Sequence, residues 1–323
     1  MPGIDALIVT HRGGILLERC LRALSAQSTA PARTLVVVSS DVETDVPDWV
    51  ELLRTPAPAD FAPAANLGLA ALGDRPVVLL NDDTTPHPEF IASLDAALDG
   101  PGIYQPRILL PDGRIDNTGH WLFWDGFNVA RGRGTRGPVQ AEVTGAFSGA
   151  AVCFTPEVLD TVGLFDAEFG AYGEDLDLSL RAIRMGFPIR YVPEAVVTHE
   201  LGATYGRVSP RKIFQVERNR TQAAIRSLPA VAILAMPATA TLRWAIMGLA
   251  ATRGLGLGQS AGVRGALAAI AGAVSGATAA PTAWSKRRRD QAYWTLDDTG
   301  MWRHLRSQRA PLSKLPGEGV SER

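Results

Sequence analysis

Short runs of aliphatic and β-branched residues alternate with helical patterns near the start of the chain, and this alternation restricts the possible fold more than any other feature. The runs are "IDALIVT" (4–10), "TLVVVSS" (34–40) and "RPVVLL" (75–80). The amphipathic segment "ILLERCLRALSAQ" (15–27) separates the first two, and "NLGLAALG" (66–73) precedes the third. Strand, helix and strand in this order favour a right-handed parallel unit. We therefore expect an α/β protein with a mostly parallel sheet flanked by helices.

Two adjacent carboxylates follow the third run, in the sequence Asn81-Asp82-Asp83. In open parallel sheets ligands bind beyond the carboxyl ends of the strands, so these acids lie where a site is expected. They have two interpretations. They cap the helix that begins near Pro88, or they hold Mg²⁺ or Mn²⁺, ions that take one or two protein carboxylates and complete their shell with phosphate and water.

A second acidic motif, "YGEDLDLSLR", places Glu174, Asp175 and Asp177 in the first turn of a predicted helix. Acids in this position complement the helix dipole, which is one explanation for them. His199 follows the predicted strand "EAVVT". It is either a hydrogen-bonded turn residue or, beside a metal, a ligand.

The charge is divided unevenly along the chain. Residues 1–200 contain 14 Lys and Arg against 27 Asp and Glu, a net charge of −13, whereas residues 201–323 contain 18 against 6, a net charge of +12. Residues 227–285 hold three Arg but no Lys, Asp or Glu, and the cluster "KRRR" (286–289) follows them. The second part of the chain is therefore basic and rich in Ala.

Arg residues and Pro237 interrupt the apolar stretches of residues 227–285, which argues against a clean membrane-spanning helix. Helices that lie on a membrane surface, with basic residues facing anionic lipid, fit this composition better. The alternative is a soluble, Ala-rich helical pair packed on the rest of the protein. A nucleic-acid partner is not expected, because the basic residues lie in apolar sequence without interleaved aromatic residues.

These patterns predict three segments: a catalytic α/β domain at 1–226, a basic helical region at 227–309 that associates with a membrane surface, and a disordered tail at 310–323. The chain starts directly with a strand pattern, without a signal-peptide pattern. Cys20 and Cys153 lie in apolar sequence and indicate a reducing compartment. We therefore expect a cytoplasmic protein, peripheral on the inner face of the plasma membrane.

Five segments in a fixed order carry a resemblance to a known family. They are "NLG" (66–68), "LLNDDT" (79–84), "PDGRIDNTG" (111–119), "GLFDAEFGAYGEDLDLSLR" (163–181) and "GFPIRYVPEAVVTHE" (186–200). Over about residues 4–205 the chain resembles the family 2 glycosyltransferases of the GT-A fold, and among these the bacterial rhamnosyltransferase-like members. The resemblance implies inverting, metal-dependent sugar transfer from a nucleotide-sugar donor. The implied donor is dTDP-rhamnose, and the implied acceptor is a lipid-linked, polyprenyl-diphosphate or polysaccharide hydroxyl.

The same resemblance implies roles for particular residues. Asp83 would bind Mn²⁺ or Mg²⁺ with His199, and Asp175 would act as the general base beside Glu174. The residues implied at the nucleotide are Thr10, His11, Arg12, Asp41, Asn66, Asn81 and Asp82. Family members commonly carry Asp-Asn-x-Ser-x-Asp after the second strand, whereas this chain has "VVVSSDVETD", so either Asp41 or Asp45 would contact the base.

Aromatic residues and other enzyme classes leave further alternatives. Trp121 and Trp124 would stack on a sugar, or they pack in the core. A sugar nucleotidyltransferase also places acids and a metal at strand ends. Such an enzyme needs a Gly-rich phosphate-binding loop, and "THRGGILLER" matches such a loop only weakly. A catalytically inactive scaffold that binds nucleotide sugar is the third alternative.

Overall fold

The computed structural model describes residues 3–137, 140–200, 209–253 and 262–315. A mixed sheet runs through the first two thirds of the chain, in the order β3-β2-β1-β4-β10-β6-β11-β5, with β7 paired to β6. Its strands are β1 (Asp5–Thr10), β2 (Thr34–Val38), β3 (Glu51–Arg54), β4 (Val77–Asn81), β5 (Thr84–Pro86), β6 (Ile103–Leu109), β7 (Ile115–Asn117), β10 (Ala151–Phe154) and β11 (Ile189–His199). A separate hairpin pairs β8 (His120–Leu122) with β9 (Asn128–Ala130).

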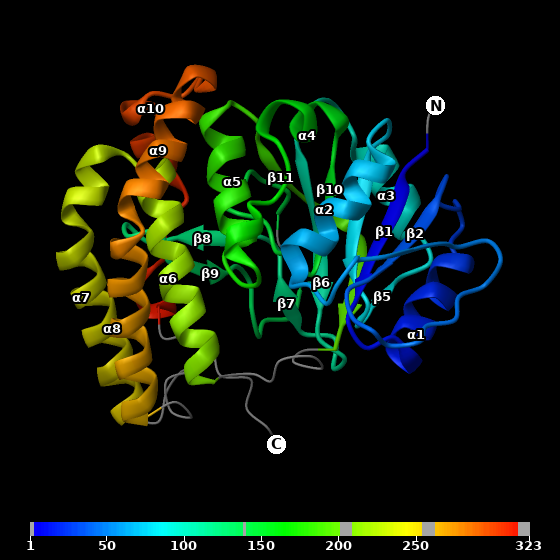
Figure 1. Cartoon of the computed structure of the whole chain (residues 1–323), viewed down its shortest axis with the longest axis horizontal. Coiled ribbons are helices and arrows are strands. Elements are labelled where there is room, and N and C mark those ends of the chain that lie inside the picture. Colours follow the sequence, from blue (N-terminus) through cyan, green and yellow to red (C-terminus); the bar gives the residue numbers. More distant parts are fainter. Residues whose placement is uncertain (1–2, 138–139, 201–208, 254–261, 316–323) are drawn as a thin grey trace.

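Helices cover both faces of the sheet, so the α/β prediction is confirmed. One face packs against α1 (Gly14–Ser25) and α3 (Phe90–Ala97), and the other against α2 (Phe61–Leu72), α4 (Pro156–Val162) and α5 (Glu174–Arg184). The remaining helices stand beside the sheet (Figure 1): α6 (Pro210–Ser227), α7 (Ala230–Thr252), α8 (Gly262–Thr278), α9 (Ala280–Asp290) and α10 (Asp298–Ser307). The short 3₁₀ turns are η1 (Ala167–Phe169), η3 (Gln291–Tyr293) and η4 (Leu312–Lys314).

Strand β1 is the point at which the strand order reverses. It pairs in parallel with β2 on one side and with β4 on the other. The register places Val9 opposite Asn81, so Thr10 and Asp82 leave neighbouring strands at the same edge of the sheet. Such a switch point forms a crevice beyond the strand ends, which is where α/β proteins bind ligands.

Ion pairs join the basic helices to the acid-rich part of the chain. In α6, the Arg226 guanidinium lies 2.9 Å from Asp166, 3.1 Å from Asp177 and 2.7 Å from Asp290. From α9, Lys286 Nζ lies 2.6 Å from Asp166. The two parts therefore share a charged and largely buried interface.

The interpretation of "KRRR" as a cluster that faces lipid is wrong for half of its residues. Lys286 is paired with Asp166, and Arg287 is buried and donates to the Leu228 carbonyl oxygen at 2.7 Å. Arg288 and Arg289 are exposed. In a helix, successive residues point in different directions, so a run of four cations cannot face one surface.

The described residues also correct the predicted tail. Ala310 and Leu315 are both 1% exposed and pack against Phe123, so residues 310–315 are ordered. The burial of these apolar side chains could not be predicted from the composition of the segment, which is rich in Pro, Ser and Lys. Residues 316–323 lie outside the described structure.

Helix α7 is long and apolar enough to cross a membrane by length and composition alone. Helices α8 and α9, extended to Tyr293, pass the same test only as a pair bent by 56°. Arg243, which seemed to interrupt this stretch, is fully buried inside the protein, and the outer surface of α7 carries Val231, Leu234 and Leu249 instead. Arg243 therefore does not argue against a membrane-spanning α7, whereas Pro237 does lie inside this helix.

Candidate active site

The turn after β1 is locked to the acids after β4. Thr10 Oγ1 donates to Asp82 Oδ2 at 2.5 Å and accepts from the Gly13 amide at 2.8 Å. Gly13 adopts a positive φ of 59°, which a residue with a side chain rarely takes. Burial raises the pKa of Asp82, and the Thr10 hydrogen bond opposes this shift. Asp82 thus shapes the edge of the crevice.

Asp83 belongs to a row of three ionisable side chains. His199, the last residue of β11, places Nε2 3.3 Å from Asp83 Oδ1 and Nδ1 3.0 Å from Asp116 Oδ2. Burial lowers the pKa of His199, but hydrogen bonds to Asp116 and Asp83 outweigh burial and raise it to about 9. Without a metal, a charged imidazolium is therefore held between two carboxylates at neutral pH.

This row fits a partial metal shell. Asp83 Oδ1 and Asp116 Oδ1 are buried oxygens that face nitrogen atoms of basic side chains, His199 Nε2 at 3.3 Å and the Arg133 guanidinium at 3.2 Å. Across the described ranges, no three His, Cys, Asp or Glu side chains form a complete ligand group. Mg²⁺ and Mn²⁺ need only one or two carboxylates when phosphate oxygens and water complete the shell. Asp83 and His199 are thus a donor set for a metal that arrives with a phosphate ligand.

Asp175 is the second residue of α5 and follows a buried glutamate. Its Oδ1 accepts from the Leu176 amide at 2.8 Å, and its Oδ2 lies 3.4 Å from the Gly149 amide. Glu174 is 7% exposed, and its Oε2 has no hydrogen-bond partner. Burial, and then the charge of Asp175, raise the pKa of Glu174 well above its usual value. Glu174 therefore keeps its proton to a higher pH than an exposed glutamate does.

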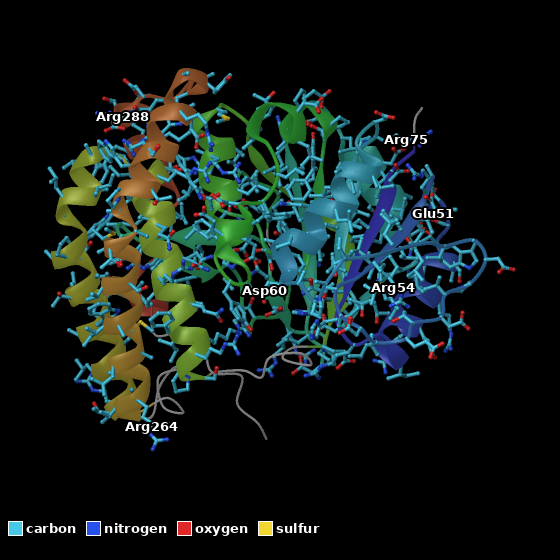
Figure 2. All side chains as sticks on the ribbon, viewed as in Figure 1. Glu51, Arg54, Asp60, Arg75, Arg264 and Arg288 are labelled. Atoms are coloured by element: carbon cyan, nitrogen blue, oxygen red, sulfur yellow. The ribbon has the colours of Figure 1, made fainter. Side chains whose placement is uncertain are left out.

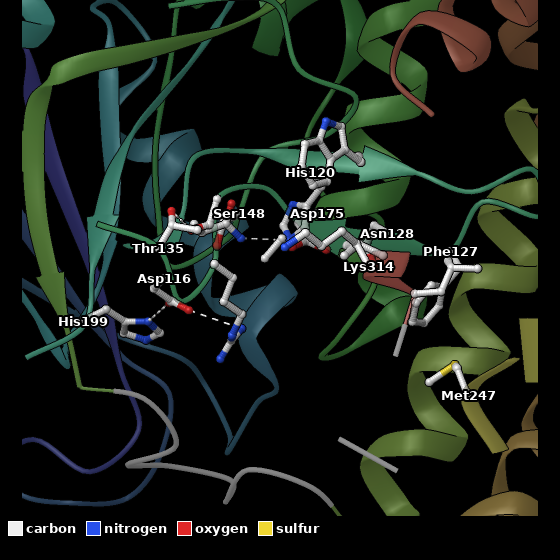
Figure 3. Close-up of a pocket in the computed structure, with 17 residues that line it drawn as sticks. Asp116, His120, Phe127, Asn128, Thr135, Ser148, Asp175, His199, Met247 and Lys314 are labelled. Carbon is white, nitrogen blue, oxygen red and sulfur yellow. Dashed lines mark hydrogen bonds and ion pairs between the residues drawn. The ribbon is translucent and has the colours of Figure 1, made fainter. Parts of the chain in front are cut away.

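A pocket of about 450 Å³ brings Asp175 of the second acidic motif together with His199. Its walls include Asp175, Asp116, His199, His120 and Trp121, and Figure 3 shows the His199–Asp116 pair and Asp175 lining the same space. Asp83 contacts this group through His199. The pocket can therefore hold a charged ligand at one end and present a carboxylate to a hydroxyl at the other.

Residues predicted at the nucleotide lie mostly along the neighbouring strand ends. His11, Arg12 and Asp41 are exposed after β1 and β2, and His11 Nδ1 lies 3.2 Å from Ser39 Oγ. Asn81 is the last residue of β4, and its carbonyl oxygen accepts from Thr84 Oγ1 at 2.6 Å. Together with Thr10 and Asp82, which are joined by a hydrogen bond, these residues surround the β1–β4 switch point.

Two predicted contacts do not lie in the site. Asn66 uses its amide to bond both backbone groups of Phe165, with distances of 2.8 and 3.0 Å, so it holds the acid-rich segment in place instead of facing a nucleotide. Trp124 packs with Phe123, with ring centroids 5.3 Å apart, and with the guanidinium of Arg309. Trp121 does line the pocket. The core-packing alternative therefore describes Trp124.

The structure adds residues to which the sequence assigned no role. Asp116 partners His199, and Arg133 lies 3.2 Å from Asp116. His120 accepts from the Asn117 amide at Nε2 and donates from Nδ1 to the Phe147 carbonyl oxygen, a pattern that fits a neutral ring. Burial lowers the pKa of His120, against the opposing charge of Asp175. Asp116 lies within "PDGRIDNTG", so that motif contained a signal for it.

The chain is similar to a known protein family and to two proteins of Mycobacterium tuberculosis. Residues 2–224 match the family described as "Glycosyltransferase like family 2". A Mycobacterium tuberculosis protein named "Pre-mycofactocin glycosyltransferase" is 30% identical over 217 residues, which are 66% of this chain. The chain spans less than half of that relative, 44% of its length. An M. tuberculosis "N-acetylglucosaminyl-diphospho-decaprenol L-rhamnosyltransferase" is 27% identical over 240 residues, 63% of this chain and 78% of the relative.

Solved structures share the fold at low sequence identity. A mannosyltransferase from Pyrobaculum calidifontis, in complex with GDP-Man and Mn²⁺, has a TM-score of 0.51 and 17% identity, and the match covers 90% of this chain and 86% of that one. S. aureus TarS in complex with UDP-GlcNAc has a TM-score of 0.54 and 13% identity, covering 95% and 92%. These likenesses confirm the predicted glycosyltransferase fold of the GT-A type.

Proposed function

This chain belongs to glycosyltransferase family 2, and from that premise we propose that it transfers a sugar from a nucleotide donor to a hydroxyl group with inversion at the anomeric carbon. The observation that carries the proposal is the pocket in which Asp175 and His199 meet, beside Asp83 and the β1–β4 switch point. One end of this arrangement suits a diphosphate, and the other suits an acceptor hydroxyl.

The donor would lie across the carboxyl ends of β1, β2 and β4. Thr10, Asp82 and Asn81 form the inner edge of this crevice, while His11, Arg12 and Asp41 border it from the exposed side. We assign the nucleotide to this border and the diphosphate to the end near Asp83. dTDP-rhamnose is the proposed donor, supported by the name of the rhamnosyltransferase relative.

Asp83 and His199 would hold Mn²⁺ or Mg²⁺, which neutralises charge on a diphosphate leaving group when it is bound. Two solved structures with this fold contain Mn²⁺, GalNAc-T7 together with UDP and the P. calidifontis mannosyltransferase together with GDP-Man. Asp116 orients His199 through the 3.0 Å contact at Nδ1, which leaves Nε2 directed toward Asp83.

Asp175 is the proposed general base. Its carboxylate is held by the Leu176 amide and lines the pocket wall, where it would accept the proton of the attacking hydroxyl. Glu174 is buried behind it and is the neighbour that retains a proton. Trp121 provides an aromatic surface for a sugar ring on the same wall.

The acceptor is proposed to be linked to a polyprenyl diphosphate at the inner face of the plasma membrane. The rhamnosyltransferase relative is named for a decaprenol-linked substrate. Helices α7 and α8 expose apolar side chains, with Leu234 83% and Val263 78% exposed. We assign residues 1–226 to catalysis and 227–309 to contact with the membrane surface, with α6 packed against both parts.

A donor screen by calorimetry tests this function. Thymidine, uridine and guanosine diphosphate sugars would be titrated into the whole chain, with and without Mn²⁺, in the wild type and in Asp83→Ala. We expect metal-dependent binding of one nucleotide class, lost in the variant. Binding of none of them would overturn the proposal, and release of diphosphate from a nucleoside triphosphate would favour the nucleotidyltransferase alternative. Binding without transfer would favour an inactive scaffold.

A further inference from the structure

A second cavity, of about 550 Å³, lies between three helices beside the active site. All three helices contribute residues to its lining. These include Val216 from α6, Trp244, Met247 and Gly248 from α7, and Ala266 and Ile270 from α8, which are spaced three or four residues apart or adjacent within each helix. Residues at this spacing line a groove parallel to the helix axes. The groove is long, apolar and open at the helix surface.

The charged groups at the base of this groove neutralise one another. Arg243 lies 2.7 Å from Glu217 Oε1 and 2.9 Å from Asp125 Oδ2, and all three side chains are buried. Arg220 adds a second cation, 3.0 Å from Glu217. Two guanidinium groups therefore face two carboxylates, so this network carries no net charge, and apart from Lys212 the rest of the groove lining is apolar or aromatic.

The groove joins the active-site pocket. Phe127 and Met247 line both cavities, so the two spaces share a wall. Asp175 lines the pocket, and the groove lining includes Val263 and Ile270, which are 78% and 49% exposed. A chain lying in the groove would thus run from the reacting end of the pocket to the exposed apolar surface of α8.

Each of the two cavities has a basic side chain in its lining. Lys212 lines the groove, with its ammonium 4.7 Å from the centre of the Tyr172 ring, and Arg133 lines the pocket. Burial, and then the charge of Arg133, lower the pKa of Lys212. The Arg133 guanidinium also lies 3.2 Å from Asp116. Arg133 Nε is buried and has no hydrogen-bond partner. Neighbouring cations of this kind suit a phosphate group.

We propose that the groove between α6, α7 and α8 binds the first units of the acceptor's isoprenoid chain, and that Lys212 and Arg133 bind the phosphate to which that chain is attached. This inference rests on the proposed glycosyltransferase function and adds a binding site to it. The groove positions the acceptor by its lipid, so that the hydroxyl to be glycosylated lies in the pocket with Asp175.

Binding of farnesyl phosphate to the full-length protein tests the site. Farnesol is the control ligand that has the isoprenoid chain without the phosphate, and inorganic phosphate is the control ligand without the isoprenoid chain. Gly248→Trp fills the groove, and an added Cβ at this position meets no atom within 4 Å, so the substitution does not force the backbone apart. Ala245→Trp adds the same side chain to the exposed surface of α7, outside the groove, and is the matched control.

We expect Gly248→Trp to raise the Kd for farnesyl phosphate at least tenfold and Ala245→Trp to change it less than twofold. Lys212→Ala would weaken farnesyl phosphate but leave farnesol unchanged. The inference is overturned if Gly248→Trp binds farnesyl phosphate as the wild type does, or if inorganic phosphate binds as tightly as farnesyl phosphate. Displacement of the probe by an equal concentration of dioleoyl phosphatidic acid would also overturn it, because the groove would then accept ordinary bilayer lipid.

Nucleotide-sugar binding, measured on the same variants, separates this inference from the proposed function. Normal donor binding with no effect of Gly248→Trp on farnesyl phosphate would reject the groove alone. Absence of donor binding in the wild type would reject the proposed function, whatever farnesyl phosphate does.

Discussion

The sheet domain and the basic helices use charge in opposite ways. In the sheet domain, Asp116 and Asp175 line one open pocket together with His199, and His199 also contacts Asp83. In the helices, Arg226 and Arg243 are buried and fully engaged with carboxylates. The first region therefore keeps charge available for a ligand, whereas the second uses charge to hold itself to the first.

This difference changes the meaning of the charge division along the chain. The net charges of −13 and +12 suggested a basic surface for anionic lipid. Much of the basic charge is instead paired across the interface with Asp125, Asp166 and Asp177. Figure 2 shows Arg264 and Arg288 at opposite ends of the helical region, so the exposed cations do not form one patch. The apolar surface of α7 and α8 is left as the stronger reason to expect membrane contact.

The largest effect should come from the available charge of the sheet domain. Asp175→Asn removes the proposed proton acceptor, and we expect the rate of sugar transfer to fall by on the order of 10²–10⁴-fold. Nucleotide-sugar affinity should stay within about twofold, because Asp175 lies at the acceptor end of the pocket. Single-turnover transfer and donor titration measure the two quantities. Asp160→Asn, an exposed change in α4, is the control, and an equal loss in both variants would contradict the role of Asp175.

The next effect concerns stability and the paired charge of the helices. Arg243→Met leaves Asp125 and Glu217 as buried carboxylates with less compensation, which costs about 3–5 kcal/mol of unfolding free energy for a broken buried pair. Arg253→Met, at the exposed end of the same helix, should stay within about 0.5 kcal/mol of the wild type. Urea denaturation measures both. A similar small change in the two variants would show that the buried network contributes little.

The fold and part of the site were predictable because local patterns encode them. Alternating aliphatic runs identified β1, β2 and β4, and the motif "YGEDLDLSLR" identified the start of α5. Asp83 contacts His199, which lines one pocket with Asp175, and the chemical roles of these residues remain predictions.

Errors arose where a partner lies far away in the sequence. Asn66 bonds Phe165, 99 residues later, and nothing near Asn66 indicates that its amide is already used. The "KRRR" cluster pairs with Asp166 and with the end of α6, so its composition suggested lipid while its contacts are with protein. A count of charges gives their number but not their partners.

The third prediction tests the apolar surface that replaces the basic patch. Leu234→Ser removes a side chain that is 83% exposed on α7, and we expect weaker binding to vesicles of anionic lipid. Loss of a buried Leu corresponds to about 1.5–3 kcal/mol, or roughly a tenfold or larger fall in partitioning if the side chain enters the bilayer. Ile15→Ser, at a position 64% exposed on α1, is the matched control. Flotation assays compare them, and equal binding by all three proteins would reject contact through α7.

The smallest effect is a change in the pH dependence of stability at Glu174, where the sheet domain buries a carboxyl group without an ion-pair partner among the described residues. Burial, and then Asp175, raise the pKa of Glu174 in the folded state, so the folded protein holds this proton after the unfolded chain has lost it. Unfolding free energy therefore declines as pH rises from the usual glutamate pKa toward the raised value.

Glu174→Gln removes the titration while keeping a similar shape, so the variant should be more stable than the wild type at pH 8. The two should converge as pH falls toward 4, where Glu174 is protonated in both states. The control is Glu168→Gln. Wild-type Glu168 carries a charge that its pairing with Lys286 near the surface stabilises, so this variant should not gain stability at pH 8. Thermal unfolding from pH 4 to pH 8 measures these differences. A constant gap between Glu174→Gln and the wild type would mean that Glu174 keeps an ordinary pKa, and the contrast between a charge left unpaired in the sheet domain and charges paired in the helices would then lose its clearest example.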